Sequence, residues 1–170
     1  TTALRMRLDD LHALWRVPDL RASAGGYFGH MWELYAFWAV VPLLCSSLLF
    51  TADTAPGGAT TAAWVGWLPA LVIGVGALGC LLGGYTARAT RSAGVAFWAL
   101  AGSGLVCLIF PFVPADHVWL KLGLLLLWGT LVVADSPQFS ALSSQAAPPH
   151  LLGMALVLQN GLGFLISVVS

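Results

Sequence analysis

The sequence predicts an all-α integral membrane protein with five transmembrane helices. A helical span needs about 20 predominantly apolar residues, and five runs of the chain reach that length. Composition agrees, because 59% of the residues are hydrophobic and 8% are charged, whereas a soluble domain carries about 25% charged residues. The predicted spans cover about residues 25–50, 62–84, 93–113, 118–142 and 151–169.

Arginine occurs on one side of these spans only. With the N-terminus inside, the cytoplasmic side holds Arg5, Arg7, Arg16, Arg21, Arg88 and Arg91. The outer loops, residues 51–61 and 114–117, contain no Lys or Arg, and Lys121 lies just inside the fourth span. The positive-inside rule therefore predicts a cytoplasmic N-terminus. Compact loops and the absence of a targeting segment favour the bacterial inner membrane, and zero net charge gives no indication of a nucleic-acid partner.

The chain divides into a short connector and a membrane domain. Residues 1–21 form an amphipathic cytoplasmic connector, because Leu4, Leu8, Leu11 and Trp15 recur at helical spacing. Its apolar stripe rests on lipid headgroups or a neighbouring helix, or else binds a dedicated partner. Residues 22–170 form the transmembrane helical domain. Since the chain opens on Thr1 and stops at the end of the fifth span, we expect a fragment or a trimmed chain rather than a complete product.

Glycines mark the second span. Gly74, Gly76, Gly79 and Gly83 give the small-residue spacing that lets two helices approach closely. Close packing is the expected role, and a gating hinge is the alternative.

Costly polar residues occur in three of the spans. His30 and Glu33 share one face of the first span, Asp135 precedes Ser-Pro in the fourth, and the fifth carries Gln159 and Asn160. At 1.5 Å per residue, the Glu33, Asp135 and Gln159 side chains lie roughly 12–15 Å deep, near mid-membrane. Ionisable residues at that depth mark substrate pathways or proton relays by default.

Structural roles are the alternative for each of these residues. Asp135 is also placed to cap the inner half of a broken helix, and His30 to hold Glu33 in a structural network. Gln159 and Asn160 suit interhelical hydrogen bonds. Tyr27 and Trp32 offer a surface for substrate, although aromatic residues are also common at membrane interfaces.

Two inner segments resemble the major facilitator superfamily of transporters. The turn at residues 83–91 resembles the family's G-x-x-x-D-R-x-G-R signature, with Gly83, Arg88 and Arg91 in register. Ala87 and Thr90 replace the signature's Asp and second Gly. Residues 147–156 are similar to a later inner loop of the form A-P-P-x-x-x-G-x-A-L.

The resemblance implies an inverted-repeat fold of two six-helix halves. It makes this chain most of a C-terminal half, with helices seven to eleven present and the twelfth absent; an N-terminal half is the alternative. The implied partners are the lipid bilayer, the missing N-terminal half, the twelfth helix and a small-molecule substrate. The turn with Gly83, Arg88 and Arg91 would be a cytoplasmic gating loop, and the first and fourth spans would line the central cavity.

We therefore expect secondary active transport of a small solute by alternating access, coupled to protons. In this hypothesis Glu33 or Asp135 takes the proton, and His30 relays the proton or adjusts how tightly it is bound. The alternative is a non-transporting membrane subunit or assembly factor. An intramembrane enzyme is a third hypothesis, which we do not favour because His30, Glu33 and Asp135 are too few ligands for a metal site in a bundle. No cofactor and no metal are expected.

Overall fold

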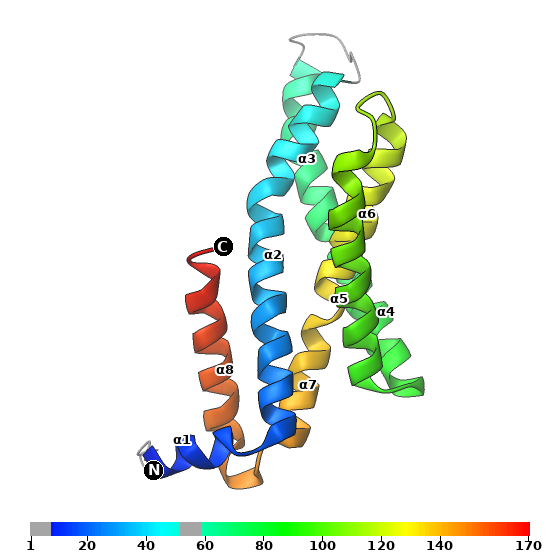
Figure 1. The fold of residues 1–170 in the computed structure, drawn as a ribbon. Coiled ribbons are helices and arrows are strands. Elements are labelled where there is room, and N and C mark those ends of the chain that lie inside the picture. Colours follow the sequence, from blue (N-terminus) through cyan, green and yellow to red (C-terminus); the bar gives the residue numbers. More distant parts are fainter. Residues whose placement is uncertain (1–7, 52–58) are drawn as a thin grey trace.

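The computed structural model describes residues 8–51 and 59–170, and all regular structure within them is helical (Figure 1). Five stretches are long and apolar enough to cross a membrane, which confirms the five predicted spans. The helices, in chain order, are α1 (Leu8–Trp15), α2 (Pro18–Thr51), α3 (Ala59–Gly74), α4 (Gly76–Ala89), α5 (Ser92–Ile109), η1 (Phe110–Phe112), α6 (Val118–Ala134), α7 (Ser136–Ala146), η2 (Pro149–Leu151) and α8 (Leu152–Ser167).

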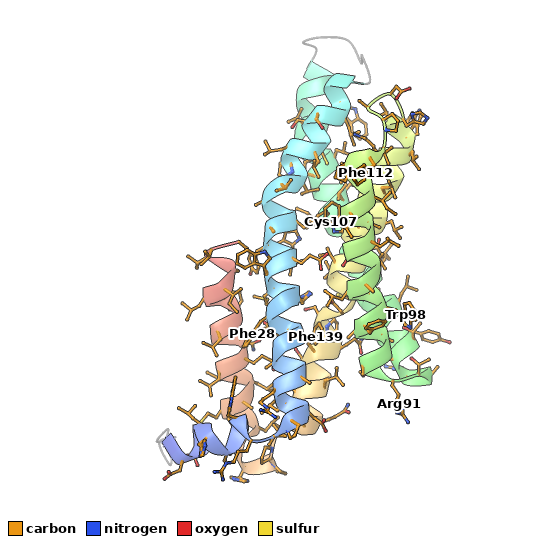
Figure 2. The ribbon with its side chains drawn as sticks, in the orientation of Figure 1. Phe28, Arg91, Trp98, Cys107, Phe112 and Phe139 are labelled. Atoms are coloured by element: carbon orange, nitrogen blue, oxygen red, sulfur yellow. The ribbon has the colours of Figure 1, made fainter. Side chains whose placement is uncertain are left out.

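The first span starts earlier than the sequence predicts. Helix α2 begins at Pro18 rather than near residue 25, because proline is well suited to the first turn of a helix, where its missing N–H costs nothing. Helix α1 precedes it at the end of the bundle that carries Arg16, Arg21, Arg88 and Arg91, hereafter the Arg-bearing face (Figures 1 and 2). Leu14 of α1 is buried in a cluster with residues of the loop before α8 and of α8 itself, so the connector rests on neighbouring helices.

The second span packs tightly against the fourth. Gly76, Gly79 and Gly83 of α4 are buried, and a Cβ atom on Gly79 would overlap the Thr130 carbonyl oxygen of α6. The structure thus confirms close packing as the reason for these glycines, since only a missing side chain permits this backbone approach. The span is interrupted at Val75, between α3 and α4.

The fourth span is broken at Asp135, between α6 and α7. Pro137 lacks an N–H and its ring clashes with the carbonyl four residues earlier, so a new helix starts here. The Asp135 carbonyl accepts hydrogen bonds from the backbone N–H groups of Gln138 and Phe139, at 2.9 and 3.2 Å. The Asp135 side chain makes no capping hydrogen bond. The expected capping role of this carboxylate is therefore absent, and the side chain extends instead toward α2.

Helix α2 lies at the centre of the bundle. It contacts α3, α6, α7 and α8, whereas α4 packs on α6 and α5 packs on α6 and α7. The half of the bundle away from the Arg-bearing face has an apolar core that includes Phe37, Val41, Leu125 and Trp128. Large apolar side chains such as Trp98 also cover the exterior, as expected of a bundle that faces lipid.

Candidate functional site

The buried interior between α2 and the break in the fourth span holds a His–Asp pair. His30 of α2 and Asp135 at the α6–α7 junction are each 1% exposed, and His30 Nδ1 lies 2.8 Å from Asp135 Oδ1. The helix break explains the contact, because it frees the Asp135 side chain from any capping bond. The two residues that the sequence places on separate spans at similar depth are thus in direct contact.

The polar atoms of this pair are incompletely satisfied by the rest of the described chain. Both ring nitrogens of His30 and both carboxylate oxygens of Asp135 are buried without a well-aligned hydrogen bond there. The Nδ1–Oδ1 contact is close enough for a hydrogen bond, so its angle rather than its length is unfavourable. Unsatisfied buried polar groups are costly, which makes this pair a candidate functional site.

Glu33 lies on the α5–α6 side of the same helix. It is partly buried and close to the Ser103 hydroxyl and the Trp128 indole, and within electrostatic range of both His30 and Asp135. Its Oε1 atom nevertheless has no well-aligned hydrogen bond within the described chain. The site therefore contains three titratable side chains at one level of the bundle.

A second polar layer lies nearer the Arg-bearing face. The Ser23 hydroxyl of α2 is 2.7 Å from the Ser143 hydroxyl of α7, and Ser143 donates to Gln159 Oε1 of α8. Gln159 Nε2 is buried and has no hydrogen-bond partner in the described part of the chain. Gln159 thus bonds to the Ser23 layer, not to the His30–Asp135 pair, because α8 contacts α2 and α7 along their Arg-bearing halves.

Tyr27 and Asn160 form an interhelical bond between the two layers. The Tyr27 hydroxyl donates to Asn160 Oδ1 at 2.8 Å, and the Tyr27 ring is 6.1 Å from the His30 ring, centre to centre. The Trp32 side chain is 49% exposed, because its position on α2 faces away from the packed helices. Its expected role as a surface for substrate stays a prediction.

The residues of the expected gating loop occupy two environments. Gly83 is buried, and a Cβ atom there would approach the Ala134 carbonyl oxygen, so this glycine serves the contact between α4 and the fourth span. Arg88 and Arg91 are exposed at the Arg-bearing face. Gly83 thus adjoins the helix break at Asp135, while Arg88 lies five residues farther along α4, about 7.5 Å nearer the Arg-bearing face.

Sequence reasoning missed Ser23, Ser143 and Phe139 as neighbours of the site. Ser23, Tyr27 and His30 follow one another at three- to four-residue spacing on α2, which is the signal that places them on one face. Phe139 gives no such signal, because an aromatic residue in an apolar span is ordinary. Its ring centre nevertheless lies 5.9 Å from that of His30.

A second His–Asp contact lies at the surface, where water screens the interaction between the two side chains. Asp116 and His117 lie 3.0 Å apart in the turn between η1 and α6, at the end opposite the Arg-bearing face, with side chains 79% and 54% exposed. The hydrogen bond from His117 holds the pKa of Asp116 below its ordinary value. Because water screens exposed pairs, this contact contributes little to stability. The buried pair has no such screening.

Metal chemistry finds no support in the geometry. Within residues 8–51 and 59–170, no group of three or more His, Cys, Asp and Glu side chains is arranged to hold a metal ion. What the arrangement offers is a buried carboxylate in contact with an imidazole, and a second carboxyl nearby, which together can accept and release a proton.

Comparison with protein-family models, with curated proteins and with solved structures finds no match for this chain. The fold and the site therefore define the class on their own: a helical protein with five helices long and apolar enough to cross a membrane. Within that class, the particular feature of this chain is a buried His–Asp pair at a broken helix.

Proposed function

We propose that this chain is part of a secondary active transporter that moves a small solute by alternating access, coupled to protons. The observation that carries the proposal is the His30–Asp135 pair, buried within the spans with unsatisfied polar atoms. Intramembrane ionisable residues mark proton relays and substrate pathways. Among the described residues no Lys or Arg lies at this depth, so a proton or a cation is the partner that the pair favours.

The helix contacts support an inverted repeat of three helices. If spans one to three repeat as spans four to six, then span one corresponds to four and span two to five. A contact between spans one and five should therefore recur between spans four and two. Both occur: α2 packs on α8, and α6 packs on α4. A three-helix inverted repeat, as in the major facilitator superfamily, predicts such matched contacts, and they are consistent with the resemblance of the inner loops.

In this proposal the roles divide among a few residues. Asp135 or Glu33 takes the proton, and His30 tunes it through direct contact with Asp135. Cys80 of α4 lies in electrostatic range of Asp135, and Cys107 of α5 in range of Glu33. The described parts of α7 and α8 bring no charged side chain to the pair. We also propose that the partners of this chain are an N-terminal half, a twelfth helix and the transported solute. The proposed location is the bacterial inner membrane, with the Arg-bearing face in the cytoplasm.

Asp135→Asn and Glu33→Gln test the proposal. Everted vesicles from cells that express the full protein are loaded with a pH-sensitive dye and given a panel of small cationic and neutral solutes. We expect a solute-evoked proton flux in the unchanged protein and its loss in Asp135→Asn, while exposed Asp116→Asn keeps it. Equal amounts of inserted protein are verified by immunoblot. A flux that persists in both amide variants would contradict proton coupling at this site.

A non-transporting membrane subunit is the second candidate function. The small-residue interface between α4 and α6 favours it in one respect, because helix packing alone explains that part of the sequence. Such a subunit would tolerate both amide substitutions, and no solute would evoke a proton flux.

A further inference from the structure

A cleft opens between α2, α5 and α7 toward the Arg-bearing face. It has a volume of about 680 Å³. Asp19, Arg91 and Gln145 provide polar groups at its outer end, and Ser23 lies deeper on the α2 wall. Figure 2 shows Arg91 at that end of the bundle, and Phe139 beside α2 farther along it.

Phe139 separates this cleft from the buried pair. Its side chain is 6% exposed; it lines the cleft together with Gly26, and its ring also contacts the ring of His30, 5.9 Å away between centres. Gly26 makes room for the ring, because a Cβ atom there would overlap Phe139 Cε1. One aromatic side chain is therefore common to the wall of the cleft and the surroundings of His30.

Phe139 is held to α2 through its backbone, while its ring packs in a buried cluster with Tyr27, Met31 and Ala96. Ser23 Oγ donates to the Phe139 carbonyl at 3.2 Å, and this bond holds the backbone of α7 to α2 without involving the ring. The helix break at Asp135 lies four residues earlier, so Phe139 stands in the first turn of α7. A rotation of the ring into the cleft would expose His30 without separating the two helices.

We propose that the α2/α5/α7 cleft is the entrance from the Arg-bearing face to the His30–Asp135 pair, and that the Phe139 ring is its gate. With the ring in place the pair is closed from this side; with the ring displaced, water and protons reach it. The inference rests on the proposed function, since it names how the same site is reached and regulated.

The chain offers a rival route that serves as a control. A second groove, of about 470 Å³, lies between α1, α2 and α8, and it is lined by Phe28, Arg21 and Gln159. Phe28 is the residue of this groove comparable to Phe139, but it contacts the Tyr27 ring, 6.3 Å away, on the other side of α2. Opening this groove by Phe28→Ala should leave access to His30 unchanged.

The test measures how fast His30 reacts with diethyl pyrocarbonate, which modifies accessible imidazoles. The full protein in everted vesicles receives a short pulse, and mass spectrometry quantifies the product at His30 relative to exposed His150. Phe139→Ala should raise the relative rate at His30 about tenfold or more, because access tracks the population of the open form. Phe28→Ala should leave it within about twofold, as independent sites behave.

A second pair of variants keeps the inference testable if Phe139→Ala fails to fold. Gly26→Ala places a methyl group against the Phe139 ring and should also raise the reactivity of His30. Gly25→Ala, whose added Cβ meets nothing within 4 Å, should not. Gel filtration confirms that each variant is folded.

Unchanged His30 reactivity in folded Phe139→Ala and Gly26→Ala proteins, or an equal rise in Phe28→Ala, would overturn the gate. This readout needs no solute. His30 reactivity that rises in Phe139→Ala would support the gate. If, in the same protein, no solute evokes a proton flux, or the flux is unchanged in Asp135→Asn and Glu33→Gln, then proton-coupled transport is refuted while the gate stands, so the two failures are distinguishable.

Discussion

The His30–Asp135 pair is an expensive arrangement for a membrane protein. Each partner is 1% exposed, and removing an ion from water costs several kcal/mol even after relaxation. If His30 and Asp135 are both uncharged, much of that cost is avoided. The protonation state of the two side chains is therefore the property to measure.

Ser143 supports the layer below the pair, and its removal should destabilise the fold. It lies within bonding distance of Ser23 and donates to Gln159. Ser143→Ala leaves the buried Gln159 Oε1 without this donor, at a cost of about 1–3 kcal/mol, while Ser23 keeps its bond to the Phe139 carbonyl. The matched control is Ser144→Ala, because exposed Ser144 bonds only to the Ser140 carbonyl of its own helix. Thermal unfolding in detergent should show a clearly lower midpoint for Ser143→Ala than for Ser144→Ala. Equal midpoints would show that the layer contributes no stability.

At residue scale, the sequence identifies groups by their chemistry but not by their contacts. His30 and Asp135 could be predicted, because ionisable side chains in apolar runs are rare. Their direct contact could not, since it depends on where Pro137 breaks the fourth span. Serine gives a weak signal in a membrane helix, because Ser23 and half-buried Ser46 look alike until the fold places Ser23 in the interior.

Among the elements, the contact between α4 and the fourth span is the tightest. Gly79 and Gly83 approach backbone carbonyls of Thr130 and Ala134, and Cys80 donates to the Val133 carbonyl at 3.4 Å. Because Ala134 precedes the helix break, this contact holds the end of α6, next to Asp135, against α4.

Gly79→Ala should therefore loosen the bundle. Its methyl group would overlap the Thr130 carbonyl, and forcing a group into a packed interior costs typically about 1–3 kcal/mol. Gly84→Ala is the control on the same helix, because its Cβ would meet nothing within 4 Å. There alanine should be neutral or stabilising by up to about 1 kcal/mol, as helix propensity predicts. Thermal unfolding of both variants measures the difference, and equal stability would refute the close-packing role of Gly79.

Element boundaries show where sequence reasoning succeeds and fails. The lengths of the apolar runs predict all five spans, because a helix that crosses a bilayer needs about 20 predominantly apolar residues. The apolar run of the second span hides the interruption at Val75, since hydrophobicity does not change there, whereas the fourth span becomes polar at Asp135. The Ser-Pro after Asp135 is the local signal for the second break, and no proline marks the first.

At the scale of the whole molecule, the distribution of arginine predicts the orientation. Arg88 and Arg91 lie at one end of the bundle, and the turn containing Asp116 lies at the other (Figure 1). The positive-inside rule then predicts that Arg91 is in the cytoplasm and Asp116 outside.

Arg91→Cys and Asp116→Cys test this orientation with an impermeant thiol reagent. In intact cells the reagent should label Asp116→Cys and leave Arg91→Cys unlabelled, whereas everted vesicles should give the reverse. The unchanged protein, whose Cys45, Cys80 and Cys107 lie within the spans, provides the background. Labelling of Arg91→Cys in intact cells would invert the topology.

The central claim is that the His30–Asp135 pair exchanges a proton, and infrared spectroscopy tests it most directly. The full protein in lipid is titrated with pH, and the carboxyl absorption is compared among the unchanged protein, Asp135→Asn and exposed Asp116→Asn. We predict a buried carboxyl band that changes with pH, survives Asp116→Asn and disappears in Asp135→Asn. A pH response that is identical in Asp135→Asn and the unchanged protein would contradict the claim and leave the pair a structural contact.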